Sequence, residues 1–284
     1  MLNILSKITN FATRISFNYH ALCIFCSLSL FLMEAFFQFK KFRIWHDQCA
    51  LKTNTDGVLL GAWACNILKN QPISFINEPS TKILDVGTGS GLISIMMAQE
   101  TKSENIIGID IDTPSVKQAK KNIEESSYSE RIKVHQMDFT GVNNTTFSPI
   151  KSFNIIISNP PFYEEETKCY NNRANTAKHT TNLSFNQLIN GVNNLLDNDG
   201  IFFVIIPYSS ALTFIASCAE NCLYLTHRCD VFTTTKMYES NTAQRVLLSF
   251  TRDIRQTEVQ QLIIKEKSGE NTSEFKKLTE NFYL

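Results

Sequence analysis

The chain has 284 residues, which is enough for one large domain or two small ones. Hydrophobic residues make up 43% and charged residues 19%, as in ordinary globular proteins. Because 27 basic residues balance 27 acidic ones, the composition excludes a global bias toward nucleic acid, and any such surface must be a local patch.

The eight cysteines do not form a metal-binding or disulfide pattern. Cys23 and Cys26 make a C-x-x-C pair, but neither a second pair nor a histidine cluster follows at zinc spacing. We therefore expect reduced, mostly buried thiols and no metal site.

Residues 1–32 differ from the rest of the chain. Lys7 and Arg14 precede an apolar stretch, Ala21–Met33, that resembles a signal-peptide core and is too short to span a bilayer. We expect the natural chain to begin at Met33, with residues 1–32 as an upstream translation artefact or a disordered appendage.

Two elements are expected before the main domain. Phenylalanines alternate with basic residues in FFQFKKFRIWH, residues 36–46, which predicts a short strand or hairpin with one basic face. The segment 53–64, TNTDGVLLGAWA, then predicts a helix. Two interpretations of its polar start stay open: Thr55 or Asp56 caps the helix, or Lys52, Thr55 or Asp56 contacts a ligand.

The stretch Ile83–Gly91, ILDVGTGSG, predicts a buried strand, a glycine turn and a helix that continues over Leu92–Ala98. Glycines let the backbone approach a ligand closely, and the helix start offers unpaired N–H groups. A dinucleotide fingerprint would need glycine where Leu92 stands. The D-x-G-x-G-x-G spacing instead resembles motif I of the class I S-adenosylmethionine-dependent methyltransferases; the alternative is a turn that merely needs glycine.

The next strand, Asn105–Asp110, ends in an acid about 20 residues past the glycines, where a carboxylate accepts both ribose hydroxyl protons. Asp112 is then expected to cap the helix that continues through Val116–Ile123. A further strand, Ile132–His135, precedes Asp138 and Phe139. The resemblance implies that Asp138 accepts from the adenine amino group of the cofactor, with Phe139 over the ring; a solvated acid is the alternative.

The strand Phe153–Ser158 runs directly into Asn159-Pro160-Pro161-Phe162. Two prolines end the ladder and stiffen the loop. The Asn159 amide oxygen and the Pro160 carbonyl can accept both N–H groups of an exocyclic amine, which aims the nitrogen lone pair at a methyl group. Phe162 offers a face on which a flipped base can stack. These residues predict methyl transfer to nitrogen and do not identify the substrate.

The remaining chain alternates strands and helices. A long polar loop, residues 163–184, carries Arg173 and Lys178 as candidate phosphate contacts, although solvated charge is the default. We expect helices at Phe185–Leu196 and Tyr208–Glu220, strands at Ile201–Ile206, Leu223–Val231 and Arg245–Thr251, and a short strand at Leu262–Lys265. This alternation predicts a parallel sheet covered on both faces, with ligands at the carboxyl ends of its strands. The terminal Phe282, Tyr283 and Leu284 are expected to pack back on the domain.

Taken together, FQFKKFRIWHDQCALKTNTDGVLLGAWA, DVGTGSGLISIMMAQ, GIDID, SNPPF and the ending NFYL resemble the tRNA1(Val) (adenine(37)-N6)-methyltransferases from Met33 to Leu284. The resemblance implies an α/β fold with a Rossmann-like seven-stranded class I methyltransferase sheet and helices on both faces. Residues 33–80 would be a hairpin and helix covering the cofactor site, and 81–284 the methyltransferase domain. The implied S-adenosylmethionine contacts are Asp85, Gly87, Gly89, Gly91, Asp110 and Asp138, and the implied adenine contacts are Asn159, Pro160 and Phe162. Phe162 stands where many relatives have tyrosine, so a stacking face is kept and the hydroxyl group is missing.

The expected function is therefore methylation of adenine N6 in tRNA, at adenine 37 of tRNA1(Val). Candidate RNA contacts are Lys40, Lys41, Arg173 and Lys178. Export would separate the enzyme from its methyl donor, so we expect a cytoplasmic enzyme without membrane contact. We also expect a monomer. Methylation of ribosomal RNA guanine N2 or of protein glutamine N5, and a silent scaffold that binds S-adenosylmethionine, remain alternatives; DNA methylation would require a target-recognition domain for which the chain has no room.

Overall fold

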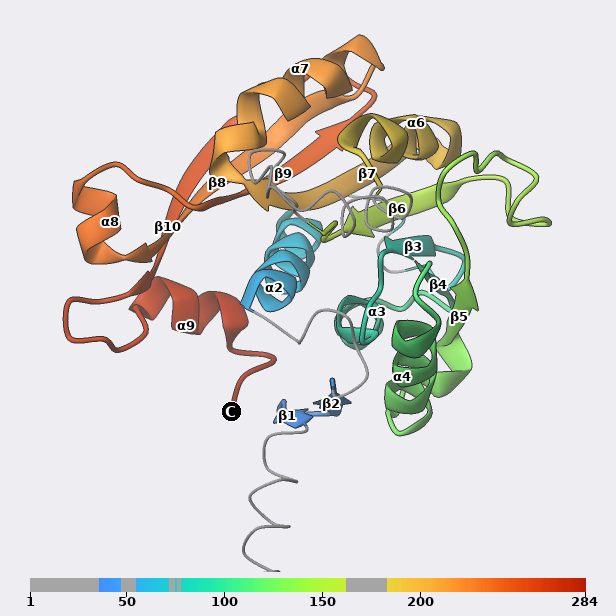
Figure 1. The fold of residues 1–284 in the computed structure, drawn as a ribbon, viewed down its shortest axis with the longest axis horizontal. Helices are drawn as coiled ribbons and strands as arrows, with labels where there is room; N and C mark the ends of the chain where they lie inside the picture. The colour runs from blue at the N-terminus through green and yellow to red at the C-terminus, as the bar shows by residue number, and fades with distance from the viewer. Residues whose placement is uncertain (1–35, 47–54, 72–74, 76–77, 162–182) are drawn as a thin grey trace, which may run out of the picture.

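The structure is a computed structural model that describes residues 36–46, 55–71, 75, 78–161 and 183–284. Its main element is a sheet of eight described strands in the order β10-β8-β9-β7-β6-β3-β4-β5 (Figure 1). Their bounds are β3 Lys82–Val86, β4 Asn105–Asp110, β5 Ile132–Gln136, β6 Phe153–Ser158, β7 Leu196–Pro207, β8 Tyr224–Thr234, β9 Arg245–Thr251 and β10 Glu258–Lys265. The predicted α/β class is confirmed.

Two details of the sheet differ from expectation. The predicted parallel order was wrong for β9, which pairs antiparallel with both β7 and β8. The connection from β8, residues 235–244, includes only the short α8 (Thr235–Glu239). It is shorter than the crossover of about a dozen residues that parallel neighbours need. The eighth strand, β10, starts four residues before the predicted Leu262 and lies at the sheet edge, parallel to β8.

Helices cover both faces of the sheet (Figure 1). One face carries α2 (Thr55–Asn70), α3 (Leu92–Glu100), α4 (Thr113–Glu124) and α9 (Ser273–Thr279), and the other carries α6 (Phe185–Leu195) and α7 (Ala211–Glu220). Single 3-10 turns occur at Ser129–Arg131 and Tyr208–Ser210. In β6, Ile155 and Ile157 enter one core and Ile156 the other, which explains why this strand is apolar throughout.

The N-terminal hairpin, β1 (Phe36–Gln38) and β2 (Arg43–Trp45), packs against the C-terminus. Phe282 is buried and its carbonyl accepts from the N–H of Lys40 at 2.8 Å. The ring of Tyr283 stacks on Phe39 with centroids 5.9 Å apart. The predicted return of the C-terminus to the domain is thus confirmed for these two residues, whereas Leu284 is exposed.

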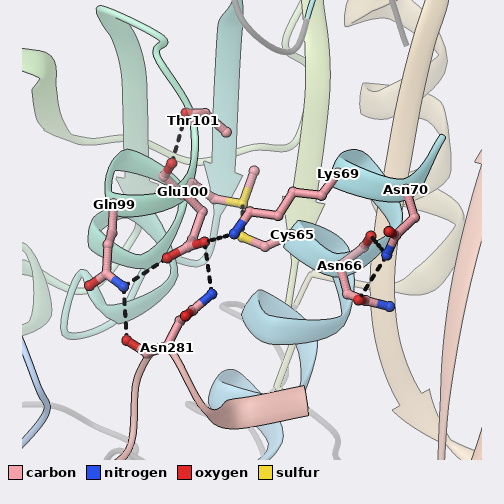
Figure 2. Close-up of polar contacts among 9 residues, drawn as sticks. Cys65, Asn66, Lys69, Asn70, Gln99, Glu100, Thr101 and Asn281 are labelled. Carbon is pink, nitrogen blue, oxygen red and sulfur yellow. Dashed lines mark hydrogen bonds and ion pairs between the residues drawn. The ribbon is translucent and has the colours of Figure 1, made fainter. Parts of the chain in front are cut away.

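A polar cluster around Glu100 ties the C-terminal segment to α2 and α3 (Figure 2). The Glu100 carboxylate pairs with Lys69 of α2 and accepts from Gln99 at 2.8 Å and from Asn281 at 3.2 Å. Gln99 also donates to the Asn281 carbonyl at 3.0 Å. Residues from both ends of the described chain also share one hydrophobic core with the sheet. The predicted domain boundary at residue 80 stays a prediction.

The described cysteines are free, and Cys65, Cys218 and Cys229 are buried as expected, whereas Cys222 is exposed. Burial raises the pKa of the Cys65 and Cys218 thiols well above the ordinary value, so both stay protonated. None of the helices in the described ranges has the length and apolar character needed to cross a membrane.

Candidate active site

The glycine turn after β3 forms the floor of the candidate site. Gly87, Gly89 and Gly91 all have positive φ, at 73°, 54° and 81°, a conformation that other residues rarely adopt. A Cβ at Gly87 would have no heavy atom within 4 Å, and one at Gly89 only the Gly87 carbonyl. These two glycines therefore leave an open space over the turn that a ligand can enter. At Gly91 a Cβ would lie 3.4 Å from Ala119, so this glycine also lets α4 approach α3 closely.

Asp85 lies beneath this turn and is fully buried. Its Oδ2 accepts from Thr88 Oγ1 at 2.7 Å, from Ser94 Oγ at 2.7 Å and from Ser94 N–H at 3.1 Å. One carboxylate thus joins the strand end, the turn and the first turn of α3. Burial raises the pKa of Asp85 to about 6, although these hydrogen bonds oppose the shift. Asp85 therefore holds the turn and the start of α3 together from below.

Asp110 ends β4 next to the glycine turn. Its two oxygens accept from the N–H groups of Gly89 and Asp112, each at 2.9 Å. A carboxylate has about four acceptor positions, so capacity remains for ligand hydroxyls. Burial raises the pKa of Asp110. The prediction that Asp112 caps the next helix is confirmed, because its Oδ2 accepts from Ser115 N–H at 2.9 Å.

Asp138 lies two residues past β5 at the same sheet edge, is exposed, and accepts from Thr140 N–H at 2.8 Å. The expectation that Phe139 covers a cofactor ring was wrong. Phe139 is buried in the core against α6, where a Cβ on Gly191 would lie 2.4 Å from its ring. An apolar ring directly after an exposed acid gains more free energy by burial than by remaining at the surface.

Asn159 and Pro160 directly follow β6, the strand next to β3 (Figure 1). Ser158 pairs with Val86 across this strand boundary, and its hydroxyl donates to the Val86 carbonyl at 2.9 Å. The strand end before the glycine turn is therefore locked to the strand end before Asn159. The Asn159 side chain is half-buried and makes no hydrogen bond with another described residue.

The start of α2 lies at this same sheet edge. Asp56 pairs with Arg245 at 2.9 Å, and Arg245 stands opposite Pro207, the last residue of β7. Arg245 is 189 positions from Asp56 in the chain. From the sequence, Asp56 was expected to cap the helix or to contact a ligand, and this ion pair was not predicted.

Comparison with known proteins identifies the family. A methyltransferase domain model matches residues 77–265. A Bacteroides fragilis protein named tRNA1(Val) (adenine(37)-N6)-methyltransferase is 37% identical over 253 residues, covering 89% of this chain and 99% of that protein. The chain belongs to the tRNA1(Val) (adenine(37)-N6)-methyltransferase family. A relative of the same name from Mannheimia succiniciproducens is 33% identical over 88% of this chain and 95% of its own length.

A solved structure of a predicted O-methyltransferase from Agrobacterium tumefaciens has a TM-score of 0.58 at 18% identity, covering 80% of this chain and 96% of that one. At this identity the likeness supports the fold alone. The chain is thus an enzyme of the methyltransferase class, with the α/β fold that this class uses.

The structure brings most predicted site residues of this methyltransferase to one sheet edge, where β3, β4, β5 and β6 end. Phe162, Arg173 and Lys178 lie outside the described residues. Lys40 and Lys41 are both exposed on the hairpin. The Nζ of Lys40 donates to the Glu280 carbonyl at 2.5 Å. The structural roles of Thr88, Ser94 and Ser158, whose hydroxyl groups donate hydrogen bonds within the site, were not predicted from the sequence. The signal that could have indicated these roles is that the three hydroxyl residues lie in or next to the two motifs.

Proposed function

We propose that the protein transfers a methyl group from S-adenosylmethionine to N6 of adenine 37 in tRNA1(Val). The single observation that carries this proposal is the hydrogen bond of Ser158 to Val86, which holds the Asn159-Pro160 strand end beside the glycine turn. A methyl donor on the turn and an amine at Asn159 would then meet at adjacent strands, which are about 5 Å apart. The names of the relatives support the choice of RNA and of base.

The residues divide the work of binding between them. The turn at Gly87 and Gly89 receives the donor in its open space, and Asp110 accepts from the ribose hydroxyls. Asp85 holds the turn from below, and Asp138 accepts from the adenine amino group of the donor. When bound, S-adenosylmethionine would supply an electrophilic methyl group on a positively charged sulfur, and the sulfur would leave with the electron pair of the broken S–C bond.

Asn159 and Pro160 orient the acceptor. Their side-chain amide and backbone carbonyl oxygens accept the two N6 hydrogens, so the nitrogen lone pair points out of the ring plane toward the methyl. The same oxygens stabilise the positive charge that reaches N6 as the C–N bond forms. The methylated nitrogen then loses a proton to water and the ring regains conjugation. Phe162 stacks on the flipped base.

The hairpin and α2 form the part of the molecule that covers the cofactor site, supported by the Asp56–Arg245 pair at the sheet edge. The enzyme acts in the cytoplasm as a monomer, and sedimentation velocity of the purified protein tests the monomer.

The decisive experiment supplies labelled S-adenosylmethionine separately with unmodified tRNA1(Val) transcript, ribosomal RNA and release-factor protein, and identifies the methylated product by mass spectrometry. A transcript with guanosine in place of adenosine 37 is the matched control. We expect N6-methyladenosine from the first RNA and none from the second. Methylguanosine from ribosomal RNA or methylglutamine from protein would contradict the substrate, and no transfer to any of the three would favour a silent scaffold.

The Asn159→Ala variant tests the mechanism on the same RNA. Loss of one positioned oxygen should lower kcat by about a hundredfold or more, with the affinity for S-adenosylmethionine retained. Turnover at the wild-type rate would refute the assigned role of Asn159.

A further inference from the structure

A cluster of exposed cations lies on the hairpin and on α4. We call it the basic face; its members are Lys40, Lys41 and Arg43 of the hairpin and Lys117, Lys120 and Lys121 of α4. None of the six makes an ion pair with another residue in the described part of the chain. The only acids of α4 and its C-cap are Glu124 and Glu125, and the Trp45 indole N–H donates to Glu125 at 2.9 Å. In a chain with zero net charge, this face is a local excess of positive charge.

The hairpin and α4 are joined into one surface. The Asn122 side chain accepts from Trp45 N–H at 2.9 Å and donates to the Trp45 carbonyl at 2.8 Å. The ammonium of Lys121 lies 4.8 Å from the centre of the Trp45 ring. These contacts hold the two elements in a defined arrangement, with β2 next to α4 (Figure 1).

The same asparagine connects the basic face to the candidate active site. Asn122 donates to the carbonyl of Ser90, within the glycine turn, at 2.8 Å. The helix that bears the lysines begins directly after Asp112, its cap, two residues past Asp110. Since β4 and β6 are separated by β3 alone, the strand ends at Asp110 and Ser158 are about 10 Å apart across the sheet, and α4 begins three residues past Asp110.

One pair of these lysines, Lys117 and Lys121, is unfavourably spaced for the helix alone. Lys117 and Lys121 are four residues apart, so their side chains leave the same side of α4, and like charges at this spacing destabilise a helix. Binding of an external polyanion would offset this repulsion between the lysines. Each lysine would neutralise a phosphate and release its counterion, which favours binding. Lysine binds phosphate as a point charge and reads no sequence, which suits contact with a backbone.

We propose that the basic face binds the ribose–phosphate backbone of the RNA substrate beside the target nucleotide, with the three α4 lysines as its centre. This inference rests on the proposed function and adds the surface that grips the body of the RNA. It extends the hairpin contacts expected at Lys40 and Lys41 to a second element.

The test replaces Lys117, Lys120 and Lys121 together by glutamine, which keeps helix propensity and removes three charges. The matched control replaces Lys236 of α8, Lys265 of β10 and Lys276 of α9, which are exposed on the β10 side of the sheet and make no ion pair with another described residue. Circular dichroism and the affinity for S-adenosylmethionine establish that both variants are folded. The dissociation constant for full-length tRNA is measured from low to high KCl, together with kcat and KM.

We expect the α4 variant to raise the tRNA dissociation constant about tenfold or more at moderate salt and to flatten the log–log salt slope by about 1 for each phosphate that is no longer neutralised. The effect should fall on KM for tRNA, while the control variant behaves as wild type. Equal tRNA affinity of the α4 variant and wild type, or an equal weakening in the control, would overturn the basic face. Absence of methyl transfer by the wild type would instead reject the proposed function, and the binding comparison would still decide the basic face.

Discussion

At the scale of single residues, Asp110 and Asp112 form a matched pair of acids two positions apart. Asp110 accepts from Gly89 in the glycine turn, whereas Asp112 caps α4. In the Asp110→Asn variant the carboxylate is removed, so we expect the dissociation constant for S-adenosylmethionine to rise about tenfold or more, as hydrogen bonds to charged groups are worth about 1.5 to 3 kcal/mol. Asp112→Asn keeps a good capping residue and should leave affinity near wild type. Isothermal titration calorimetry measures both, and equal effects would contradict a ribose contact specific to Asp110.

The raised pKa of the buried Asp85 predicts how the free energy of unfolding depends on pH. The folded protein holds its proton up to about pH 6, whereas the unfolded chain releases it near pH 4. The folded state therefore binds more protons between these values, so the contribution of Asp85 to the free energy of unfolding falls as pH rises through this window, by about 3 kcal/mol in total. Urea unfolding of wild type and Asp85→Asn from pH 4 to 7 isolates this group. Two parallel stability curves would refute the raised pKa.

At the scale of elements, the Asp56–Arg245 pair joins the start of α2 to the start of β9. Because both side chains are partly exposed, solvent screens the pair and we expect a coupling of about 0.5 to 1 kcal/mol. Asp56→Asn, Arg245→Gln and the double variant, unfolded in urea, form the double-mutant cycle. Strictly additive effects in the cycle would show that the two side chains are not coupled.

The same three variants also bear on function. If the pair also holds α2 over the cofactor site, each single variant should weaken S-adenosylmethionine binding, and the double variant should weaken it by less than the sum of the singles. Unchanged affinity in all three variants would limit the pair to stability.

At the scale of the whole molecule, the C-terminus closes the core that begins with the hairpin. Phe282 is 2% exposed and Leu284 is 86% exposed, so the last residues offer a buried side chain and an exposed control. Phe282→Ala should reduce the free energy of unfolding by about 3 kcal/mol, since it removes a buried ring and leaves a cavity. Leu284→Ala should change it by less than about 0.5 kcal/mol. Urea denaturation of both variants measures the difference; a small effect at Phe282 would mean that the end of the chain does not support the core.

The local elements of the domain could be predicted because their signals are local. The bounds of β4 and β6 agree with the sequence to the residue, since each is an apolar run closed by a polar residue. The cap at Asp112 follows from an acid before a helical pattern. The glycine turn was predicted from its residues, and the structure adds that Gly87, Gly89 and Gly91 all have positive φ.

Pairings between distant segments could not be predicted. Lys40 contacts Glu280 and Asp56 contacts Arg245, and nothing in either neighbourhood specifies a partner about 200 positions away. Phe139 resembled a ligand-facing aromatic in sequence, but the small Gly191 on α6 creates the space that buries it. A pattern of apolar residues predicts which side chains are buried and whether the segment is a helix or a strand. It does not predict which other element packs against the buried side chains.

The sequence by itself therefore determined the fold class, the glycine turn, the strand-end asparagine and the family resemblance, because each rests on neighbouring residues. Only the tertiary structure decided the antiparallel β9, the position of Asp85 beneath the turn and the joining of hairpin and α4 through Asn122. The physical reason is that these features depend on packing and hydrogen bonds between segments brought together by the sheet, whose free energy no single stretch of sequence carries.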